Sequence, residues 1–146
     1  MANTKLSDAT HILAYIAINE NKTEIKSTTI AESINTSPSL VRRMMSSLKK
    51  AGLLNAIPGA ATPSLAKDPK DISLLDVYFA VSGDQELLNV DEHTNANCPV
   101  GSIIPEVLVH YYEEIQNTAE AKMAKINLQE IIDDVSVQQA KQAIIK

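Results

Sequence analysis

Residues 28–54, TTIAESINTSPSLVRRMMSSLKKAGLL, hold the feature that most constrains the fold: two helical patterns separated by a very short turn. Asn35 follows the first pattern, and asparagine tolerates the left-handed backbone conformation in which many helices end. Ser37 and Pro38 then place a capping residue before a proline at the first helical position, which predicts a second helix to about residue 51. Two helices joined by so tight a turn predict a helix-turn-helix.

The segments on either side extend this unit into a winged helix-turn-helix. Residues 6–18 carry apolar side chains at helical spacing, and Ser7 is available to cap that helix. After the helix-turn-helix, LLNAI and PSLA bracket the small turn PGAAT, which predicts two short strands. Ser73 and Asp76 then resemble a capping box for one more helix. We therefore predict a mainly α fold with a small β-hairpin wing, in which residues 1–82 form the winged helix-turn-helix domain.

The remainder of the chain is predicted to be a loop followed by a helical arm. Residues 83–101 hold four acidic side chains and show little periodicity, which indicates a loop. From about residue 102 to residue 126, apolar positions recur in alternating steps of three and four, which predicts one long helix. Two short helices, starting at Asn127 and Ser136, complete an arm over residues 102–146.

The apolar stripe of the long helix exceeds what a small domain needs for its own core. More than six turns of it follow a domain that is already complete, so the stripe requires a partner surface. We expect the arm to pack on the first domain and to form a homodimer. The alternative is that the stripe is ordinary core. The residues expected at the dimer interface are Ile104, Leu108, Tyr111, Ile115, Ala119 and Met123.

Charge is distributed unevenly along a chain whose formal net charge is −5. Residues 1–70 carry nine basic and five acidic side chains, a balance of +4, whereas residues 71–146 carry four and thirteen, a balance of −9. Between Ser33 and Lys67 there are five basic residues and no acidic one. A local basic segment in an acidic protein indicates a polyanion site, because its field is confined to one surface.

Both arginines of the chain, Arg42 and Arg43, lie side by side in the second helix of the predicted helix-turn-helix. That helix enters the major groove of DNA in this motif. The planar guanidinium fork matches two phosphate oxygens or the O6/N7 edge of guanine. The alternative is that the arginines solubilise an exposed helix or pair with acids. The residues expected to contact DNA are Ser27, Thr28, Ser37, Ser39, Arg42, Arg43, Ser46, Lys49, Lys50 and Lys67.

Several classes of protein are disfavoured by the sequence. No apolar run approaches the roughly 18 residues of a membrane span, and the N-terminus does not resemble a secretory signal. With Cys98 as its single cysteine, the chain forms no internal disulfide, which favours a reducing, cytoplasmic setting. His93 and Cys98 are a poor metal motif, and no nucleophile–base pair or phosphate-binding loop is recognisable. We predict that the protein is not an enzyme, holds no metal and has no membrane partner.

Cys98 is the one candidate for chemistry. It precedes Pro99 and could act as a single-thiol redox switch, provided that its pKa is lowered and its sulfur is exposed. The acidic loop NVDEHTNANC is expected to raise that pKa. A packed or inert thiol is the alternative that we favour.

Several blocks of the sequence together resemble the Rrf-type bacterial transcription regulators. These blocks are TTIAESINTSPSLVRRMMSSLKKAGLL, KDPKDISLLDVYFAVSG, NCPVG and INLQEIIDDV, within a resemblance that spans residues 7–135. The family includes IscR, NsrR and CymR, and the likeness is greatest to its YwnA-like branch. The resemblance implies a homodimeric winged-helix repressor whose long helices cross and whose recognition helices enter successive major grooves of a palindrome. By match to the recognition-helix block, Ser37, Ser39, Arg42 and Arg43 occupy the positions that face bases and phosphates.

The chain departs from the family pattern in two places. Members with a metallocluster carry three cysteines in the loop before the long helix, whereas this loop has Cys98 alone, with Asp91, Glu92 and His93 nearby. One thiolate does not hold a cluster in the usual way, so we predict no cofactor. The wing, IPGAATPSLAK, lacks the arginine that enters the minor groove in the family. Lys67 and backbone amides are the remaining candidates there.

The sequence therefore predicts a cytoplasmic, homodimeric, sequence-specific DNA-binding regulator, a repressor, that binds a palindromic operator through the helix at residues 37–50. The alternative is a dimeric protein-interaction or redox-sensing module with weak or no DNA binding. A small-molecule or redox effector is compatible with either, but no set of residues identifies it. Salt dependence of DNA binding distinguishes the two functions, because phosphate contacts weaken steeply as salt is added.

Overall fold

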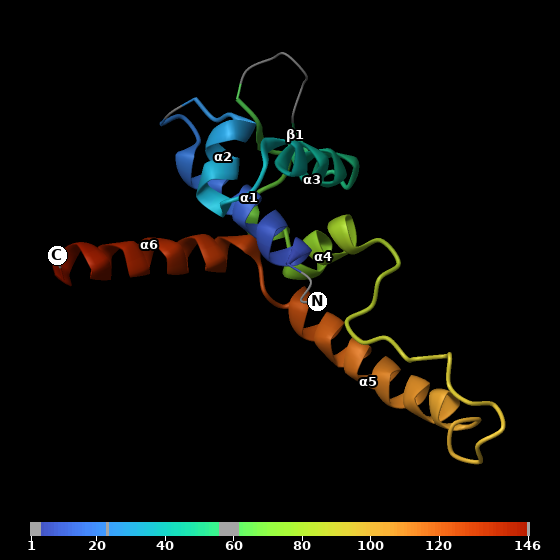
Figure 1. The fold of residues 1–146 in the computed structure, drawn as a ribbon. Helices are drawn as coiled ribbons and strands as arrows, with labels where there is room; N and C mark the ends of the chain where they lie inside the picture. The colour runs from blue at the N-terminus through green and yellow to red at the C-terminus, as the bar shows by residue number, and fades with distance from the viewer. Residues whose placement is uncertain (1–3, 23, 56–61, 146) are drawn as a thin grey trace.

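The computed structural model of the chain describes residues 4–22, 24–55 and 62–145. It confirms the mainly α fold with a small antiparallel hairpin (Figure 1). The elements in chain order are α1 (Lys5–Asn19), α2 (Ser27–Ile34), α3 (Pro38–Lys50), β1 (Leu54–Asn55), β2 (Ser64–Leu65), the 3₁₀ helix η1 (Pro69–Asp71), α4 (Leu74–Ser82), α5 (Ile104–Ala124) and α6 (Leu128–Ile145).

Helix α1 lies at the centre of the domain and carries much of the aliphatic core. Its residues Ile12, Leu13 and Ile16 are fully buried, and the helix packs against α2, α3, α4, α6 and β2. The helix begins at Lys5 after Thr4, so Ser7 lies inside the first turn and its predicted capping role is wrong. With so few aromatic residues, the domain excludes water mainly through Ile, Leu, Val and Ala side chains.

The turn between α2 and α3 has the predicted geometry. Asn35 adopts the left-handed conformation, with φ 61° and ψ 50°, and the amide of Thr36 donates to the Ala31 carbonyl. Ser37 then caps α3, because its Oγ accepts a hydrogen bond from the Leu40 amide (3.3 Å), and Pro38 occupies the first helical position. The two helices are therefore held at a fixed angle by local hydrogen bonds.

Replacement of Asn35 tests this turn. Asn35→Ala is expected to lower the free energy of unfolding by about 1 kcal/mol, because a Cβ without the asparagine amide disfavours the left-handed conformation. Asn35→Gly is the matched control and is expected to be near neutral, since glycine adopts this conformation without steric cost. Urea unfolding of the three proteins measures the difference, and an alanine variant as stable as wild type would contradict it.

The end of α3 leads directly into the hairpin. The amide of Gly52 (φ 77°) donates to the Lys49 carbonyl and that of Leu53 to the Leu48 carbonyl, a Schellman motif. Strands β1 and β2 follow, paired antiparallel with Leu54 opposite Leu65, and Leu54 is buried against the core. Residues 56–61, which include most of the predicted PGAAT turn, lie outside the described residues.

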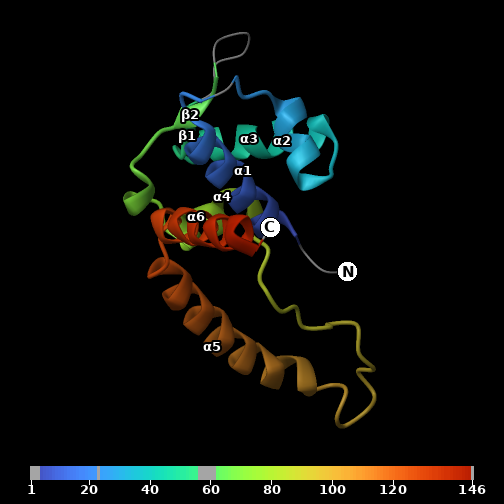
Figure 2. The same ribbon diagram turned by 90° about the vertical axis from the view of Figure 1, so that its left-hand side faces the viewer.

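The C-terminal arm consists of two helices that leave the domain in different directions (Figures 1 and 2). Helix α4 is capped as predicted, with reciprocal hydrogen bonds between Ser73 and Asp76 of 2.9 and 3.0 Å. Helix α5 starts at the far end of the loop at residues 83–103 and runs back beside it to the domain, where it contacts α4. Helix α6 starts at the domain, where it packs on α1 and η1 with Leu128 buried, and then extends away from it.

Helix α6 is continuous, so the prediction of two short helices over this segment is wrong. Asn127 does start it, since its Oδ1 accepts from the Glu130 amide and its own amide donates to Glu130 Oε2 (both 2.9 Å). Ser136, expected to start a second helix, instead donates from Oγ to the Ile132 carbonyl (3.2 Å). A serine hydroxyl bonded one turn back lies within a helix and does not interrupt it.

Candidate nucleic-acid interface

Helix α3 presents two chemically different faces. Its apolar face is directed into the domain, with Val41, Met44 and Leu48 buried and Leu40 and Met45 packed against them. Its opposite face is polar and open to solvent. The predicted DNA-contact residues on and before this helix are all exposed: Ser37, Ser39, Arg42, Arg43, Ser46, Lys49 and Lys50. Their contact with DNA stays a prediction, but none of these side chains is packed in the core.

The two arginines are available for an external anion. Within residues 4–22, 24–55 and 62–145, neither Arg42 nor Arg43 forms an ion pair with a carboxylate. Arg42 Nη1 donates a hydrogen bond to Ser27 Oγ (3.2 Å) at the start of α2, and no side-chain hydrogen bond of Arg43 is found in the same ranges. The alternative that the two arginines pair with the protein's own acids therefore does not hold among the described residues.

The remaining predicted contacts differ in position. Ser27 is half-buried and Thr28 exposed at the start of α2, next to the arginine side of α3. Lys67 is exposed but follows β2, where it shares one hollow with Ala51 and Phe79 and another with residues of α1 and α6. The structure thus groups Ser27 and Thr28 with the arginines, whereas Lys67 lies past the C-terminal end of α3.

The predicted dimer stripe on α5 is largely uncovered. Ile104, Tyr111 and Ile115 are 40%, 60% and 48% exposed, while Leu108, Ala119 and Met123 are half-buried. Sequence reasoning missed Val107, which is also exposed on this side. Val107 lies three residues after Ile104 and four before Tyr111, and this helical spacing could have placed it in the predicted stripe. The exposed apolar surface therefore runs from the start of α5 through its first three turns.

A buried polar network that the sequence did not predict joins the loop to α4 and α5. Gln116 is 8% exposed; its Oε1 accepts from the Leu87 amide (2.9 Å), and its Nε2 donates to Tyr78 Oη (3.0 Å) and to Glu120 Oε2 (3.0 Å). Tyr78 Oη in turn donates to the Gln85 carbonyl (3.0 Å). These bonds satisfy groups that would be costly to bury alone, and they fix the first part of the loop.

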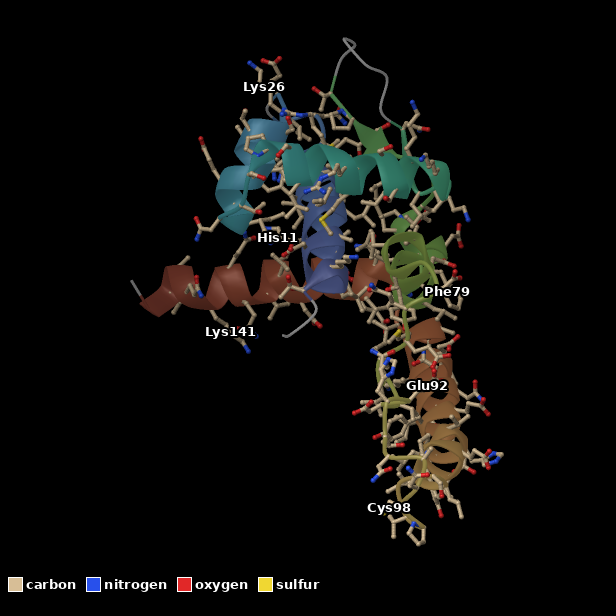
Figure 3. The ribbon with its side chains drawn as sticks, turned by 45° about the vertical axis from the view of Figure 1, so that its right-hand side comes forward. His11, Lys26, Phe79, Glu92, Cys98 and Lys141 are labelled. Carbon is tan, nitrogen blue, oxygen red and sulfur yellow. The ribbon has the colours of Figure 1, made fainter. Side chains whose placement is uncertain are left out.

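Cys98 lies at the far end of this loop, away from α3 (Figure 3). The residue is half-exposed, and hydrogen bonds from the backbone amides of Gly101 and Val100 lower the pKa of its thiol below the usual value. The prediction that the acidic loop raises this pKa is therefore wrong. The amides of this turn stabilise the thiolate at short range, and they outweigh the opposing effect of partial burial.

The lowered pKa gives an expected pH dependence. Because only the thiolate reacts, the rate of iodoacetamide alkylation of Cys98 should reach half its maximum at a lower pH in the folded protein than in the urea-unfolded chain. Gly101→Ala should move the folded value back up, since a Cβ there would meet the Asn95 carbonyl oxygen at 2.8 Å and displace the turn. Equal midpoints for folded and unfolded wild type would contradict the expectation.

The other histidines and acids do not gather into a metal site. His11 Nε2 hydrogen-bonds Ser33 Oγ (2.8 Å), and the amide of exposed His93 donates to Asp91 Oδ1 (2.8 Å). In the parts of the chain that are described, no three His, Cys, Asp or Glu side chains are grouped so as to hold a metal ion. None of the described helices has both the length and the apolarity to span a bilayer.

The same fold and sequence pattern occur in known proteins. Residues 2–134 match the family model Rrf2, described as an iron-dependent transcriptional regulator. YwnA of Bacillus subtilis (strain 168), named as an HTH-type transcriptional regulator, is 43% identical over 133 residues, which are 91% of this chain and 98% of YwnA.

Solved structures agree with the fold. A crystal structure titled as that of a DNA binding protein has a TM-score of 0.68 and 39% identity, covering 88% of this chain and 98% of its own. IscR of T. potens has a TM-score of 0.67 at 20% identity, and the match covers 92% of this chain and 88% of the IscR chain. The second of these supports the fold alone.

The family description raises the question of iron, and the residues present do not fit an iron–sulfur cluster. Such clusters are held by several cysteine thiolates, whereas Cys98 is the single cysteine of the chain. The potential ligands that precede it in the same loop, Asp91, Glu92 and His93, form no ligand group with it among the described residues. The chain therefore lacks the set of thiolate donors that a cluster of this kind requires.

Proposed function

The chain belongs to the Rrf2 family of transcriptional regulators, and we propose that it is a sequence-specific DNA-binding repressor that acts in the cytoplasm as a homodimer on a palindromic operator. Helix α3 enters the major groove, and α2 crosses the DNA backbone beside it. Arg42 and Arg43 contact bases or phosphates, and the hydroxyls of Ser37 and Ser39 add hydrogen bonds at the start of the helix. Lys49 and Lys50 lie further along α3, where they neutralise phosphates.

The observation that carries this proposal is the exposed arginine pair on the outer face of α3, without a carboxylate partner among the described residues. An arginine exposes five donors in a rigid fork and cannot lose its charge, so two unpaired arginines form a strong local attraction for a polyanion. The inner face of the same helix is fixed in the core, which holds the outer face at a defined orientation.

The charge distribution supports the same orientation on DNA. Residues 71–146 carry the acidic excess, and they form α4, α5, α6 and the loop, below the helix-turn-helix in Figure 1. DNA would repel this half of the molecule and attract the face around α3. The uneven charge thus favours one approach of the protein to the duplex over all others.

The exposed stripe on α5 supports the homodimer. Monomeric proteins rarely leave a contiguous line of large apolar side chains uncovered, and Ile104, Val107, Tyr111 and Ile115 form such a line. A two-fold axis at this helix would present two α3 helices to one face of DNA and double the phosphate contacts. A palindromic operator has the same two-fold symmetry as such a dimer.

Selection of bound sequences from random double-stranded DNA by the purified protein tests the proposal. An inverted repeat should be enriched, with half-site centres separated by about 10 base pairs or a multiple of one helical turn. Recovery of no enriched sequence at low salt would reject sequence-specific binding. Recovery of a single, unrepeated half-site would retain the DNA-binding function and reject the palindrome.

A redox-sensing or protein-interaction role for the same dimer is the second candidate, and the lowered pKa of Cys98 favours it. A stabilised thiolate is more readily oxidised than an ordinary thiol. If this role operated without DNA binding, then Arg42 and Arg43 would be dispensable and added salt would have little effect. A steep loss of DNA affinity with salt decides for the regulator.

A further inference from the structure

The two adjacent arginines of α3 have different surroundings. Arg42 Nη1 donates a hydrogen bond to Oγ of Ser27, the first residue of α2, over 3.2 Å. The Arg43 side chain has no hydrogen bond or ion pair within the described residues. Two side chains that are identical in chemistry and neighbours in sequence are therefore held differently before any ligand arrives.

The direction of the Ser27 contact separates the two side chains in space. Successive residues on an α-helix point about 100° apart. Arg42 reaches the start of α2, and this spacing directs the exposed Arg43 to a different side of α3 from that contact. In a helix-turn-helix the first helix of the pair crosses the DNA backbone, whereas the early residues of the second helix reach the base edges. The arginine tied to α2 therefore lies on the phosphate side of the interface.

We propose that the two arginines have different targets on DNA: Arg42, positioned by Ser27, binds a backbone phosphate, and Arg43 reads the O6/N7 edge of a guanine. This division of roles rests on the proposed DNA-binding function. It assigns sequence preference to one side chain of the pair, and register and affinity to the other. Ser27 is then a positioning residue, which acts through Arg42.

The chemistry of each side chain suits its assigned role. A guanidinium has five N–H donors, so Arg42 keeps four after one is used on Ser27, enough for a bidentate contact with two phosphate oxygens. Holding the side chain before binding also reduces the conformational entropy that it loses on DNA. Guanine readout instead requires the whole fork to be directed at the groove floor, and Arg43 has no competing protein partner among the described residues.

The two roles are separated by measuring affinity for the selected operator, for operators with one base pair changed, and for unrelated DNA. Arg43→Ala should reduce the preference for one G·C pair per half-site by on the order of 10- to 100-fold. Replacing that guanine with 7-deazaguanine, which lacks N7, should weaken wild type but not Arg43→Ala. Arg42→Ala should weaken operator and unrelated DNA by the same factor, with the salt slope reduced by about 0.9 for each phosphate that is no longer neutralised.

A double-mutant cycle tests the role of Ser27. Ser27→Ala should weaken binding a few-fold without changing base preference, and it should have almost no effect in the Arg42→Ala background. Ser27→Thr keeps the hydroxyl and should retain the wild-type affinity. Thr28→Ala, at the next residue, is the matched control, and its effect should add to that of Arg42→Ala, since no hydrogen bond between these two side chains is found in the described ranges. Thermal unfolding confirms that each variant is folded.

The results distinguish failure of the inference from failure of the proposed function. If wild type selects no operator, the DNA-binding function and the division of roles are both rejected. If wild type binds a defined operator, but Arg42→Ala changes the preferred base or Arg43→Ala does not, only the division of roles is rejected. Additive effects of Ser27→Ala and Arg42→Ala reject the positioning role of Ser27.

Discussion

The double variant Arg42→Ala, Arg43→Ala is expected to bind the selected operator at least about a thousandfold more weakly than wild type at physiological salt. A dimer would lose four guanidinium groups, and with them both phosphate neutralisation and base-edge hydrogen bonds. Both side chains are exposed on α3, so their removal should leave the core, formed by residues such as Val41 and Leu48, intact. Fluorescence anisotropy over a salt series measures both the affinity and its salt slope.

The matched control removes the same charge elsewhere. Lys122→Ala, Lys125→Ala changes two exposed basic side chains at the end of α5, in the acidic half of the chain. Its net charge equals that of the arginine double variant, so a general electrostatic effect would weaken both equally. A specific interface requires the lysine variant to bind nearly as wild type does. Retention of operator binding by the arginine double variant would contradict the regulator function.

Local features of the fold were predictable because each depends on a few neighbouring residues. The Ser37 cap, Pro38 at the first position and Asn35 in the left-handed turn are short-range steric and hydrogen-bond effects. The two faces of α3 follow equally from helical spacing, since a residue every three or four positions meets the core. These features place the candidate interface, and the structure reproduces them.

Other features were not predictable from the sequence, because they depend on distant contacts or on a choice between local conformations. Gln116 is buried because Tyr78 and Leu87 reach it from other elements, and its own sequence neighbours give no sign of this. Ser136 has two options, to start a helix or to bond back within one, and the propensity of serine does not choose between them. The pKa of Cys98 depends on the orientation of two backbone amides, which the count of nearby acids does not reveal.

The replacement of Tyr111 and Ile115 with glutamate is expected to convert the proposed dimer into a monomer. These side chains are 60% and 48% exposed in the single chain, so they are free to meet a partner. A two-fold interface would bury four new carboxylates without counter-charges, and each costs several kcal/mol to desolvate. Sedimentation equilibrium should then give a mass near 15.8 kDa for the variant and near twice that value for wild type.

A second pair of glutamates on the same helix separates the stripe from a general effect of charge. His110→Glu, Asn117→Glu adds two carboxylates at exposed positions at least about 100° around α5 from Tyr111 and Ile115. This control should stay dimeric, and a variant at the stripe that also stays dimeric would show that α5 is not the interface.

Loss of the dimer should further weaken operator binding by about 10²- to 10⁴-fold, because the second half-site is no longer bound intramolecularly. If the monomeric variant bound the full operator as tightly as wild type, then dimerisation through α5 would not contribute to recognition of the palindrome.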